Sequence, residues 1–464
     1  MTFASIFNDV LGPIMRGPSS SHTAGSYHIA ATARSLLGEA PARATFTFDP
    51  DGSYAETYRE QNADKAFITG LLGWPPTDAR FGKAVVEARR LGVDIAFRVA
   101  KLRRTDHPNM VLARLAGVSG KKFDLLAKST GGGTFTVVEV GGREVSIDGK
   151  RGIRVRGVGT AEPVYFIQKG KPLFASATEM VRFARRRRLS LGDAALGYET
   201  VLLGMSEGEA AAEMRRRYAV MEASIEAGLN PAKIRLSLLR PTAHKILEAE
   251  RRGRLPLGGI PTRAAARATA VMHASNSGGV VCAAPTGGSA GVIPAVLVTL
   301  AREMSVPEPT LIKALFAAGA VGLVFARRAT FAAEIAGCQV EIGAAGAMAA
   351  AAVVEAAGGT ASEACDAAAV ALQNTMGSVC DLVQGRCEIP CHTRNAAAAA
   401  AAFLCADLVR GGYRNPISLD ETVDASMASG QMLPPELRVT SRGGLAVTPS
   451  ARALGRQRGR QKRS

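Results

Sequence analysis

Two different hydrophobic patterns divide the chain into an N-terminal and a C-terminal part. In the first 160 residues, short alternating or β-branched runs predict strands at residues 44–48, 95–99, 134–140 and 153–155. Helical patterns separate these runs at residues 26–37, 65–72 and 82–91. Because strands and helices are mixed, we predict an α+β domain for this part of the chain.

From about residue 178 the strand signals fade, and alanine-rich helical patterns with glycine or proline between them take their place. Asn395 is predicted to cap the last helix, and Gly411 with Gly412 to end it. We therefore predict a larger, mostly all-α C-terminal domain, with helices at residues 179–187, 206–227, 263–273, 292–304, 308–318, 344–357 and 396–409.

The same patterns predict the domain boundaries. We expect the α+β domain at residues 1–160, a linker at residues 161–176, the helical domain at residues 177–452 and a basic, disordered tail at residues 453–464. Within the linker, Lys169-Gly170-Lys171-Pro172 carries the strongest loop signal. No internal repeat of fixed period is visible in the sequence.

Charge and composition narrow the classes of function. The 464 residues carry a net charge of +17, largely from arginines in short runs and in the tail. Aromatic residues make up only 5%, and no known nucleic-acid-binding pattern is present, so we expect solvated arginine-rich faces and no specific nucleic-acid partner. The chain starts without a signal-peptide pattern, and its longest apolar runs, residues 314–326 and 396–406, are shorter than the roughly 20 residues of a membrane span. We expect a cytoplasmic protein without a membrane partner.

Three cysteines in the C-terminal third, Cys338, Cys380 and Cys391, are candidates for metal binding. Three thiolates are one short of the four that close an iron–sulfur cluster, and an iron left open is a Lewis acid. The alternative is that each cysteine is simply a small buried hydrophobic residue. All seven cysteines lie in the second half of the chain, which is unlike a secreted disulfide scaffold.

A cluster of hydroxyl residues around one histidine lies near the N-terminus. Gly-Pro leads into it and a helical pattern follows, so free amides and hydroxyls at a helix start can bind a carboxylate or phosphate. A capped turn, in which the hydroxyls satisfy backbone donors, is the alternative. The residues are Ser19, Ser20, Ser21, His22 and Thr23.

Two glycine-rich loops lie between apolar helical segments of the second half. Such loops let backbone amides approach a ligand closely. Neither has the spacing of a phosphate loop or a dinucleotide fingerprint, and a packed corner between helices is the alternative. The loops are Ser275-Asn276-Ser277-Gly278-Gly279 and Ala284-Pro285-Thr286-Gly287-Gly288-Ser289-Ala290-Gly291.

Taken together, these motifs resemble the iron–sulfur-dependent L-serine dehydratases (L-serine ammonia-lyases), with the family's β and α parts fused in one chain. The resemblance spans nearly the whole chain with its motifs in the family's order. The β part is similar at Gly17–Gly25, Gly52-Ser53-Tyr54-Ala55-Glu56-Thr57-Tyr58, His107-Pro108-Asn109 and Ser129-Thr130-Gly131-Gly132-Gly133. The α part is similar at Ser277-Gly278-Gly279, Pro285–Gly291, Gly337-Cys338-Gln339-Val340-Glu341-Ile342-Gly343, Val379-Cys380-Asp381, Ile389-Pro390-Cys391, Arg394-Asn395-Ala396 and Gly443-Gly444-Leu445-Ala446-Val447-Thr448-Pro449.

The resemblance implies a [4Fe–4S] cluster held by Cys338, Cys380 and Cys391, and β-elimination of water from L-serine to give pyruvate and ammonia. It makes the helical domain catalytic and the expected assembly a homodimer. The expected catalytic residues are His22, Ser20, Ser21 and Thr23, with His22 as base or as an orienting group. The expected substrate-binding residues are Ser19, Ser277, Thr286, Gly287, Gly288 and Ser289. Cys282, Cys365, Cys387 and Cys405 lie off the family's ligand positions, with Cys387 close enough in sequence to Cys391 to be a neighbour.

Three stretches depart from the family's usual sequence: residues 240–245, Arg327 with Arg328, and residues 382–384. Two arginines beside the active site would favour a more anionic substrate than serine, whereas on the surface they would carry no such meaning. A lyase for threonine, cysteine or a more anionic β-hydroxy amino acid is therefore one alternative. A non-catalytic iron–sulfur sensor is another.

Overall fold

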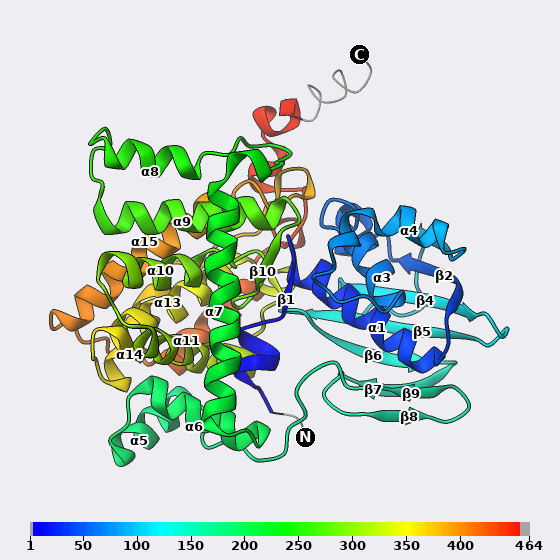
Figure 1. Ribbon diagram of the computed structural model, residues 1–464, viewed down its shortest axis with the longest axis horizontal. Helices are drawn as coiled ribbons and strands as arrows, with labels where there is room; N and C mark the ends of the chain where they lie inside the picture. The colour runs from blue at the N-terminus through cyan, green and yellow to red at the C-terminus, as the bar shows by residue number, and fades with distance from the viewer. Residues whose placement is uncertain (1–2, 455–464) are drawn as a thin grey trace.

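A six-stranded sheet forms the centre of the N-terminal region in the computed structural model, which describes residues 3–454 (Figure 1). Its strand order is β3-β2-β4-β5-β6-β7, and β2 pairs with β3 in parallel while the other neighbours are antiparallel. The bounds are β2 Pro41–Phe48, β3 Asp94–Val99, β4 Met110–Gly117, β5 Lys122–Gly131, β6 Thr134–Val140 and β7 Arg143–Ile147. A separate hairpin, β8 Ile153–Val155 with β9 Gly159–Ala161, follows.

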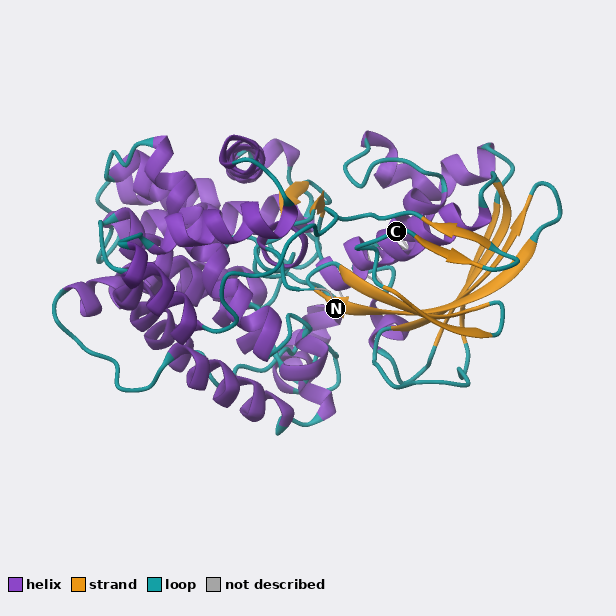
Figure 2. Ribbon diagram, turned by 90° about the horizontal axis from the view of Figure 1, so that it is seen from below, coloured by secondary structure: helices purple, strands orange, loops and turns teal. Residues whose placement is uncertain are grey.

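Helices cover one face of this sheet (Figure 2). Alternate residues of β2, among them Phe46 and Phe48, point toward the helices because side chains of a strand alternate between its two faces. The rings of Phe46 and Phe67 stack with their centroids 4.4 Å apart. The helices of this region are α1 Gly25–Leu37, α2 Ser53–Thr57, α3 Ala63–Leu71 and α4 Ala84–Arg90.

The C-terminal region is a bundle of helices around α13, Ile342–Ala356. Every residue of α13 from Ile342 to Glu355 is buried, and its many alanines and glycines let neighbouring helices approach closely. The other helices are α5 Ala177–Arg187, α6 Leu191–Leu203, α7 Glu207–Leu229, α8 Ala243–Arg251, α9 Gly259–Asn276, α10 Val292–Glu303, α11 Glu308–Arg328, α12 Ala333–Ala336, α14 Ala361–Gln373, α15 Cys391–Arg410 and α16 Leu419–Gln431. The predicted α+β region followed by a mostly helical region is confirmed.

The first residues of the chain pack with the helical region, which the predicted boundary at residue 160 did not anticipate. Ile6, Phe7 and Val10 are buried in the helical core. Next, β1 (Ile14–Arg16) pairs antiparallel with β10 (Val280–Cys282), 266 residues further along the chain. Because β1 is held by the helical region and α1 by the sheet, the segment between them lies at the boundary of the two regions (Figure 1). Residues 162–176 carry no helix or strand and connect the regions.

Several element predictions need correction. Asn395 does not cap a helix, because α15 already begins at Cys391 and places Asn395 inside it. The helix predicted at residues 308–318 continues to Arg328. Residues 453 and 454 end a helical turn, and the rest of the predicted tail, residues 455–464, lies outside the described residues. The strands β1, β4, β5, β7, β9 and β10 and the helices α2, α6, α8, α12, α14 and α16 were not predicted.

Two helical segments are long and apolar enough to span a membrane by length and composition alone: α11 and residues 338–356. The apolar segment of α11 is therefore longer than the run predicted at residues 314–326. In the most apolar part of α11, 78% of the residues are buried inside the protein, and in that of residues 338–356 the share is 94%. This burial is typical of core helices of a helical bundle.

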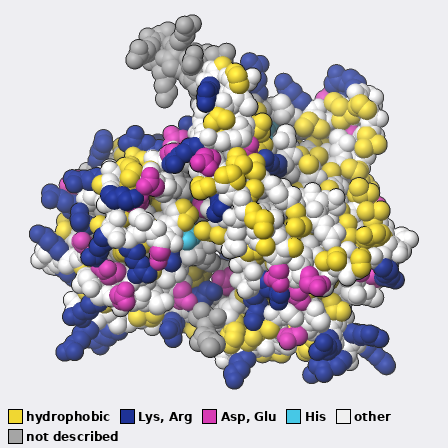
Figure 3. Space-filling view, turned by 180° about the vertical axis from the view of Figure 1, so that it is seen from behind, with side chains coloured by type: hydrophobic (Ala, Val, Ile, Leu, Met, Phe, Trp, Pro, Cys, Tyr) yellow, Lys and Arg dark blue, Asp and Glu magenta, His cyan; other side chains and the backbone are white. Residues whose placement is uncertain are grey.

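The basic side chains are distributed over the surface. On the face shown in Figure 3, Lys and Arg lie around the rim and alternate with Asp and Glu, while hydrophobic side chains occupy much of the middle. Many of the arginines pair with neighbouring acids, as Arg216 does with Glu213 and Arg302 with Glu226. Exposed pairs of this kind contribute at most about 1 kcal/mol each.

Candidate functional site

A narrow cavity lies where the N-terminal hydroxyl segment meets the cysteine segments. Both regions of the chain contribute to its wall. The lining residues are Ser19, Ser21, Gln61, Gly288, Glu334, Glu341, Cys380, Leu382, Cys387, Cys391 and Val439. Residues as far apart in the sequence as Ser19 and Val439 thus meet around one cavity, whose wall carries thiol, carboxyl and hydroxyl groups.

The three predicted cysteine ligands are brought together at this cavity. Cys380 and Cys391 line it, and the thiols of Cys338 and Cys380 are hydrogen-bonded to each other. The Sγ atoms of Cys338 and Cys380 and a carboxylate oxygen of Glu341 all lie within 4.8 Å of one another. All three cysteines are buried, so their sulfur atoms are shielded from bulk solvent.

Each cysteine is positioned by backbone contacts to a different element. Cys338 stands in the turn just before α13, and its N–H donates to the Ser378 carbonyl at 2.9 Å. Cys380 donates to the Leu437 carbonyl at 2.8 Å and accepts from the Val439 N–H at 2.8 Å. Cys391 is the first residue of α15. Three separate segments therefore hold the three cysteines in place, and each cysteine remains a free thiol.

Asn395 connects the third cysteine to a glycine-rich loop. Its side chain donates to the Cys391 and Gly288 carbonyls, both at 2.8 Å, and accepts from the Gly291 N–H at 3.0 Å. Asn395 is fully buried, so these three bonds satisfy an amide that would otherwise be costly to bury. The residue expected to be a helix cap thus ties α15 to the loop at Gly288.

A guanidinium group favours the thiolate form at Cys338. The hydrogen bond from Cys380 lowers the pKa of Cys338, and Arg394, whose Nη1 lies 3.4 Å from the Cys338 Sγ, acts in the same direction. The same hydrogen bond, together with burial, raises the pKa of Cys380 well above its usual range. Arg394 is held by the Asp381 carboxylate at 3.1 Å. Without a metal, the pair therefore keeps a proton on Cys380 and favours a thiolate on Cys338.

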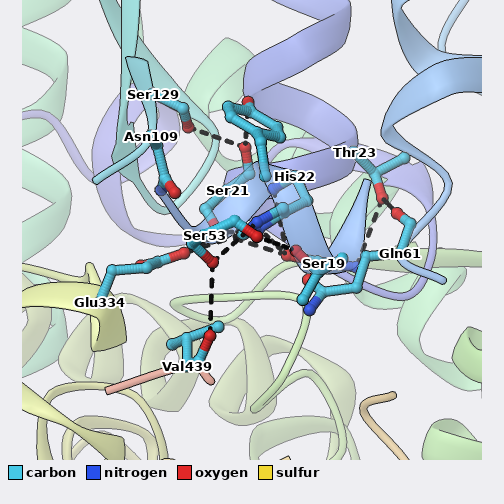
Figure 4. Close-up of polar contacts among 12 residues, drawn as sticks. Ser19, Ser21, His22, Thr23, Ser53, Gln61, Asn109, Ser129, Glu334 and Val439 are labelled. Atoms are coloured by element: carbon cyan, nitrogen blue, oxygen red, sulfur yellow. Dashed lines mark hydrogen bonds and ion pairs between the residues drawn. The ribbon is translucent and has the colours of Figure 1, made fainter. Parts of the chain in front are cut away.

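His22 is fully buried behind the cavity wall, in a network of buried polar side chains (Figure 4). Ser21 Oγ donates to Glu334 Oε1 at 2.7 Å and lies 3.0 Å from His22 Nδ1. His22 Nε2 lies 3.2 Å from Ser53 Oγ. Burial lowers the pKa of His22, and the nearby Glu334 carboxylate partly offsets that effect. His22 is therefore kept neutral near pH 7, and Ser21 and Glu334 are the members of the network that line the cavity.

Two hydroxyl–glycine loops approach each other closely beside this network. A Cβ atom placed on Gly287 would lie only 2.6 Å from the Pro18 carbonyl oxygen and 2.8 Å from the Ser20 nitrogen. Only a residue without a side chain fits at position 287 without moving the backbone of the N-terminal segment. The Gly287 loop therefore packs directly against Ser19–Ser20 and fixes the N-terminal segment relative to the helical region.

Glu341 lines the cavity next to Gly288, where a Cβ on that glycine would lie 3.3 Å from Glu341 Oε2. Burial raises the pKa of Glu341 well above its usual range, and the nearby Cys338 adds to this effect. Thr286 Oγ1 hydrogen-bonds to the Glu341 carboxyl and to Ser289 Oγ, the latter at 3.0 Å. The cavity therefore contains one carboxyl group whose protonated form is favoured, beside the thiols of Cys338 and Cys380.

The other predicted site residues take different places. Thr23 donates to the Gln61 carbonyl at 2.8 Å, Ser20 is buried against Gly287, and Ser289 is used within its own loop, so none of the three lines the cavity. Ser277 lies outside the cavity, at the C-terminal end of α9. Its hydroxyl accepts a hydrogen bond from the Arg235 N–H at 2.9 Å. The expectation that Ser277 binds substrate has no support in this geometry.

Sequence reasoning gave no role to several residues of the site. Glu334, Gln61, Leu382 and Val439 line the cavity, and Ser53 contacts His22. Glu334 and Glu341 are isolated acids in apolar, alanine-rich segments, and this isolation is the signal that could have identified them. Gln61 and Val439 carry no such signal, because only the fold brings them to the cavity.

Arg327 and Arg328, the departures that suggested an anionic substrate, are exposed at the end of α11. Arg328 pairs with Asp424 on α16. Neither arginine lines the cavity. They therefore give no reason to expect a more anionic substrate than serine.

Similarity to known proteins agrees with this geometry. The family described as "Serine dehydratase alpha chain" matches residues 127–446. The "Probable L-serine dehydratase, alpha chain" of Bacillus subtilis is 35% identical over 61% of this chain and 94% of its own length. The "L-serine dehydratase" of Mycobacterium bovis is 30% identical over 93% of this chain and 95% of its own length, and "L-serine dehydratase TdcG" of Escherichia coli is 30% identical over 93% and 96%. With its matched residues, its fused α+β and helical regions and its converging cysteines, this chain belongs to the serine dehydratase family.

Proposed function

We propose that this protein is a cytoplasmic L-serine ammonia-lyase, which dehydrates and deaminates L-serine to pyruvate and ammonia with a [4Fe–4S] cluster. The observation that carries the proposal is that Cys380 and Cys391 line one buried cavity with carboxyl and serine hydroxyl groups, and that the thiol of Cys338 is hydrogen-bonded to that of Cys380. The relatives named as L-serine dehydratases support the choice of substrate. All seven cysteines are free thiols, which supports a reducing compartment. The homodimer stays a prediction.

The donor atoms at the cavity fit an iron–sulfur cluster. Three buried thiols from three segments are soft ligands of the kind that hold such clusters, and Arg394 beside Cys338 offsets their negative charge. When the cluster is bound with one iron available to substrate, it supplies a Lewis acid that makes the serine hydroxyl a better leaving group. The remaining chemistry belongs to the side chains around it.

The hydrogen bonds around His22 determine which ring nitrogen carries the proton. The single hydrogen of Ser21 is used by the Glu334 carboxylate at 2.7 Å, because a carboxylate only accepts. His22 Nδ1, 3.0 Å from Ser21 Oγ, must then carry a hydrogen and donate it to Ser21, and Nε2 accepts from Ser53. A neutral His22 in this form has no free position toward the cavity, so its proposed role is to orient Ser21 and, through it, Glu334.

Glu334 is the proposed base for the α-proton of serine. It lines the cavity, and the donation from Ser21 to Oε1 leaves Oε2 as the oxygen that can take a proton. Glu341, whose pKa is raised by burial, is suited to give a proton to the departing hydroxyl oxygen. Two carboxyl groups in one cavity would thus divide the acid and base roles between them.

Asn109 is the proposed contact for the polar groups of the substrate. Its side chain is fully buried, and neither its Oδ1 nor its Nδ2 has a hydrogen-bond partner within the protein. Asn109 is not among the residues that line the cavity, but Figure 4 shows its side chain on the side of the network where Ser53 and Glu334 lie. A buried amide without partners costs about 1–3 kcal/mol, which a polar ligand with an ammonium or carboxylate group would remove. Ser19 Oγ, at the cavity wall, is the second proposed contact.

The proposal is tested by anaerobic reconstitution with ferrous iron and sulfide, followed by assays for pyruvate and ammonia. We expect Cys338→Ala, Cys380→Ala and Cys391→Ala each to lose the cluster absorbance and the activity together. Cys405→Ala is the matched control, because Cys405 is equally buried on α15 and does not line the cavity. Full iron content and normal turnover of the Cys380→Ala protein would contradict the proposal. A panel of threonine, cysteine and aspartate-like β-hydroxy amino acids tests the choice of serine.

A further inference from the structure

A fourth thiol faces the same cavity. Cys387 lines it together with Cys380 and Cys391, and the thiols of Cys387 and Cys391 are hydrogen-bonded to each other. The remaining cysteines, Cys282, Cys365 and Cys405, are buried elsewhere and do not line the cavity. Four of the seven sulfur atoms therefore converge at one place, whereas the resemblance to the family gave ligand roles to only three.

The backbone holds Cys387 firmly in this position. Asn276 Nδ2 donates to the Cys387 carbonyl at 2.8 Å. The next residue, Glu388, is buried and accepts the N–H groups of Ser237, Leu238 and Leu239 at 2.6, 2.7 and 2.9 Å. Since the Cys387 carbonyl and the residue that follows it are both anchored to the helical region, Cys387 is kept at the cavity wall, and the residue is only 6% exposed.

Packing alone does not account for a thiol at this position. A buried cysteine that serves only to fill space has apolar neighbours, as an inert structural cysteine does. Cys387 instead touches the thiol of Cys391, and it lines a cavity whose wall includes Glu334 and Glu341. Its neighbours are therefore the groups proposed to bind metal and substrate.

We propose that Cys387 supplies a fourth thiolate to the metal group when no substrate is bound, an inference that rests on the proposed function. Coordination replaces the S–H bond of Cys387 with a sulfur–iron bond and releases one proton to the solvent. Cys338, Cys380 and Cys391 hold the cluster permanently, and serine competes with Cys387 for the remaining iron. The iron that substrate uses is thereby held by the protein in the resting state instead of being exchangeable.

The consequence is measurable without an activity assay. Oxidation by ferricyanide removes one electron from a [4Fe–4S]²⁺ cluster, and one Fe²⁺ leaves, so that a paramagnetic [3Fe–4S]⁺ cluster remains. The iron that lacks a protein thiolate is the one that is lost. Electron paramagnetic resonance follows the appearance of the three-iron cluster, and iron analysis measures the loss.

The experiment compares the reconstituted full chain with Cys387→Ala, Cys387→Ser and the control Cys405→Ala, each treated with the same ferricyanide concentration under argon. We expect both Cys387 variants to convert to the three-iron cluster about tenfold faster than the unchanged chain and the control, because cysteine thiolates are what retain the irons. Saturating L-serine is expected to reduce this difference, since serine displaces Cys387 from the unchanged chain.

The outcomes separate this inference from the proposed function. Equal conversion rates in all four proteins would overturn the role of Cys387 while leaving the three-cysteine cluster intact. A chain that takes up no iron and sulfide at all would overturn the proposed function and this inference with it. A folded Cys387→Ala protein that assembles no cluster, while Cys405→Ala assembles one, would support ligation by Cys387. Cys387→Ser preserves the size of the side chain and guards against a packing defect.

Discussion

Substituting Gly287 with alanine tests whether the two halves of the site depend on one close contact. The new Cβ would lie 2.6 Å from the Pro18 carbonyl oxygen, 2.8 Å from the Ser20 nitrogen and 3.1 Å from the Ser19 carbonyl carbon. All three are backbone atoms, so no side chain can rotate away. To reach an ordinary contact of 3.4 Å, the loops must separate by up to about 0.8 Å, the difference between 3.4 and 2.6 Å.

This separation sets the expected magnitudes. Overpacking a well-packed interior costs about 1–3 kcal/mol, so we expect the free energy of unfolding to fall by about 2 kcal/mol. Ser19 and Ser21 move with the backbone of the N-terminal segment and away from the cysteines and Glu341. Since a misplacement of about 1 Å can cost about a hundredfold in rate, we expect kcat/KM for L-serine to fall by roughly ten- to a hundredfold.

The assay pairs anaerobic denaturant unfolding with initial rates of pyruvate formation, normalised to iron content. Gly346→Ala is the matched control. Gly346 lies inside the buried helix α13, and a Cβ there meets only Ala398 Cβ, at an ordinary 3.7 Å. We expect that variant to keep its activity and to gain about 0.5–1 kcal/mol from helix propensity. If Gly287→Ala matches the unchanged chain in stability and kcat/KM, the packing of the two loops is not what positions the site.

Three further predictions follow from individual side chains. Glu334→Gln should keep the hydrogen bond from Ser21 but lower kcat by at least about a hundredfold with its iron content unchanged, and an unchanged kcat would exclude Glu334 as the base. Asn109→Ala should raise the KM for serine. It should change the unfolding free energy by less than about 1 kcal/mol, because the lost packing is offset by removing an unsatisfied amide. An unchanged KM would argue against contact between Asn109 and the substrate. His28 is fully buried and its pKa is lowered to about 4, so as the pH falls below 6.5 the unfolded chain binds a proton that the folded chain does not. Stability should thus fall between pH 6.5 and 4, by roughly 3 kcal/mol for this group, and a His28→Gln protein should show a shallower pH dependence in equilibrium unfolding.

Local sequence patterns were enough to predict the long helices and the strands with clear alternation. The predicted ranges at residues 134–140 and 153–155 match β6 and β8, and α10 and α13 begin within two residues of their predicted starts. These elements have short-range signals that packing does not override. The strands β4 and β5 were missed because leucine, alanine and lysine in them suit a helix as well as a strand. Only their pairing with β2 and β6 decides between the two structures.

The kinds of side chain in the site could be recognised in the sequence, because glycine-rich loops, a serine–histidine segment and spaced cysteines are local features. Their arrangement could not. Pairing of β1 with β10 joins residues 14–16 to residues 280–282, and this long-range contact carries the N-terminal hydroxyl segment to the cysteines. It also decides that Ser21 and Glu334 line the cavity while His22 stands behind them.

For this protein, the sequence by itself determined the composition of the two regions and the identity of the chemical groups. The tertiary structure decided which of those groups share one cavity. It placed Ser277 outside the cavity, brought Glu334 and Gln61 to its wall, and placed Cys387 beside the expected ligands. The physical reason is that helix and strand propensities depend on neighbours along the chain. A cavity is made by residues hundreds of positions apart, whose proximity depends on how the hydrophobic faces of whole elements pack together.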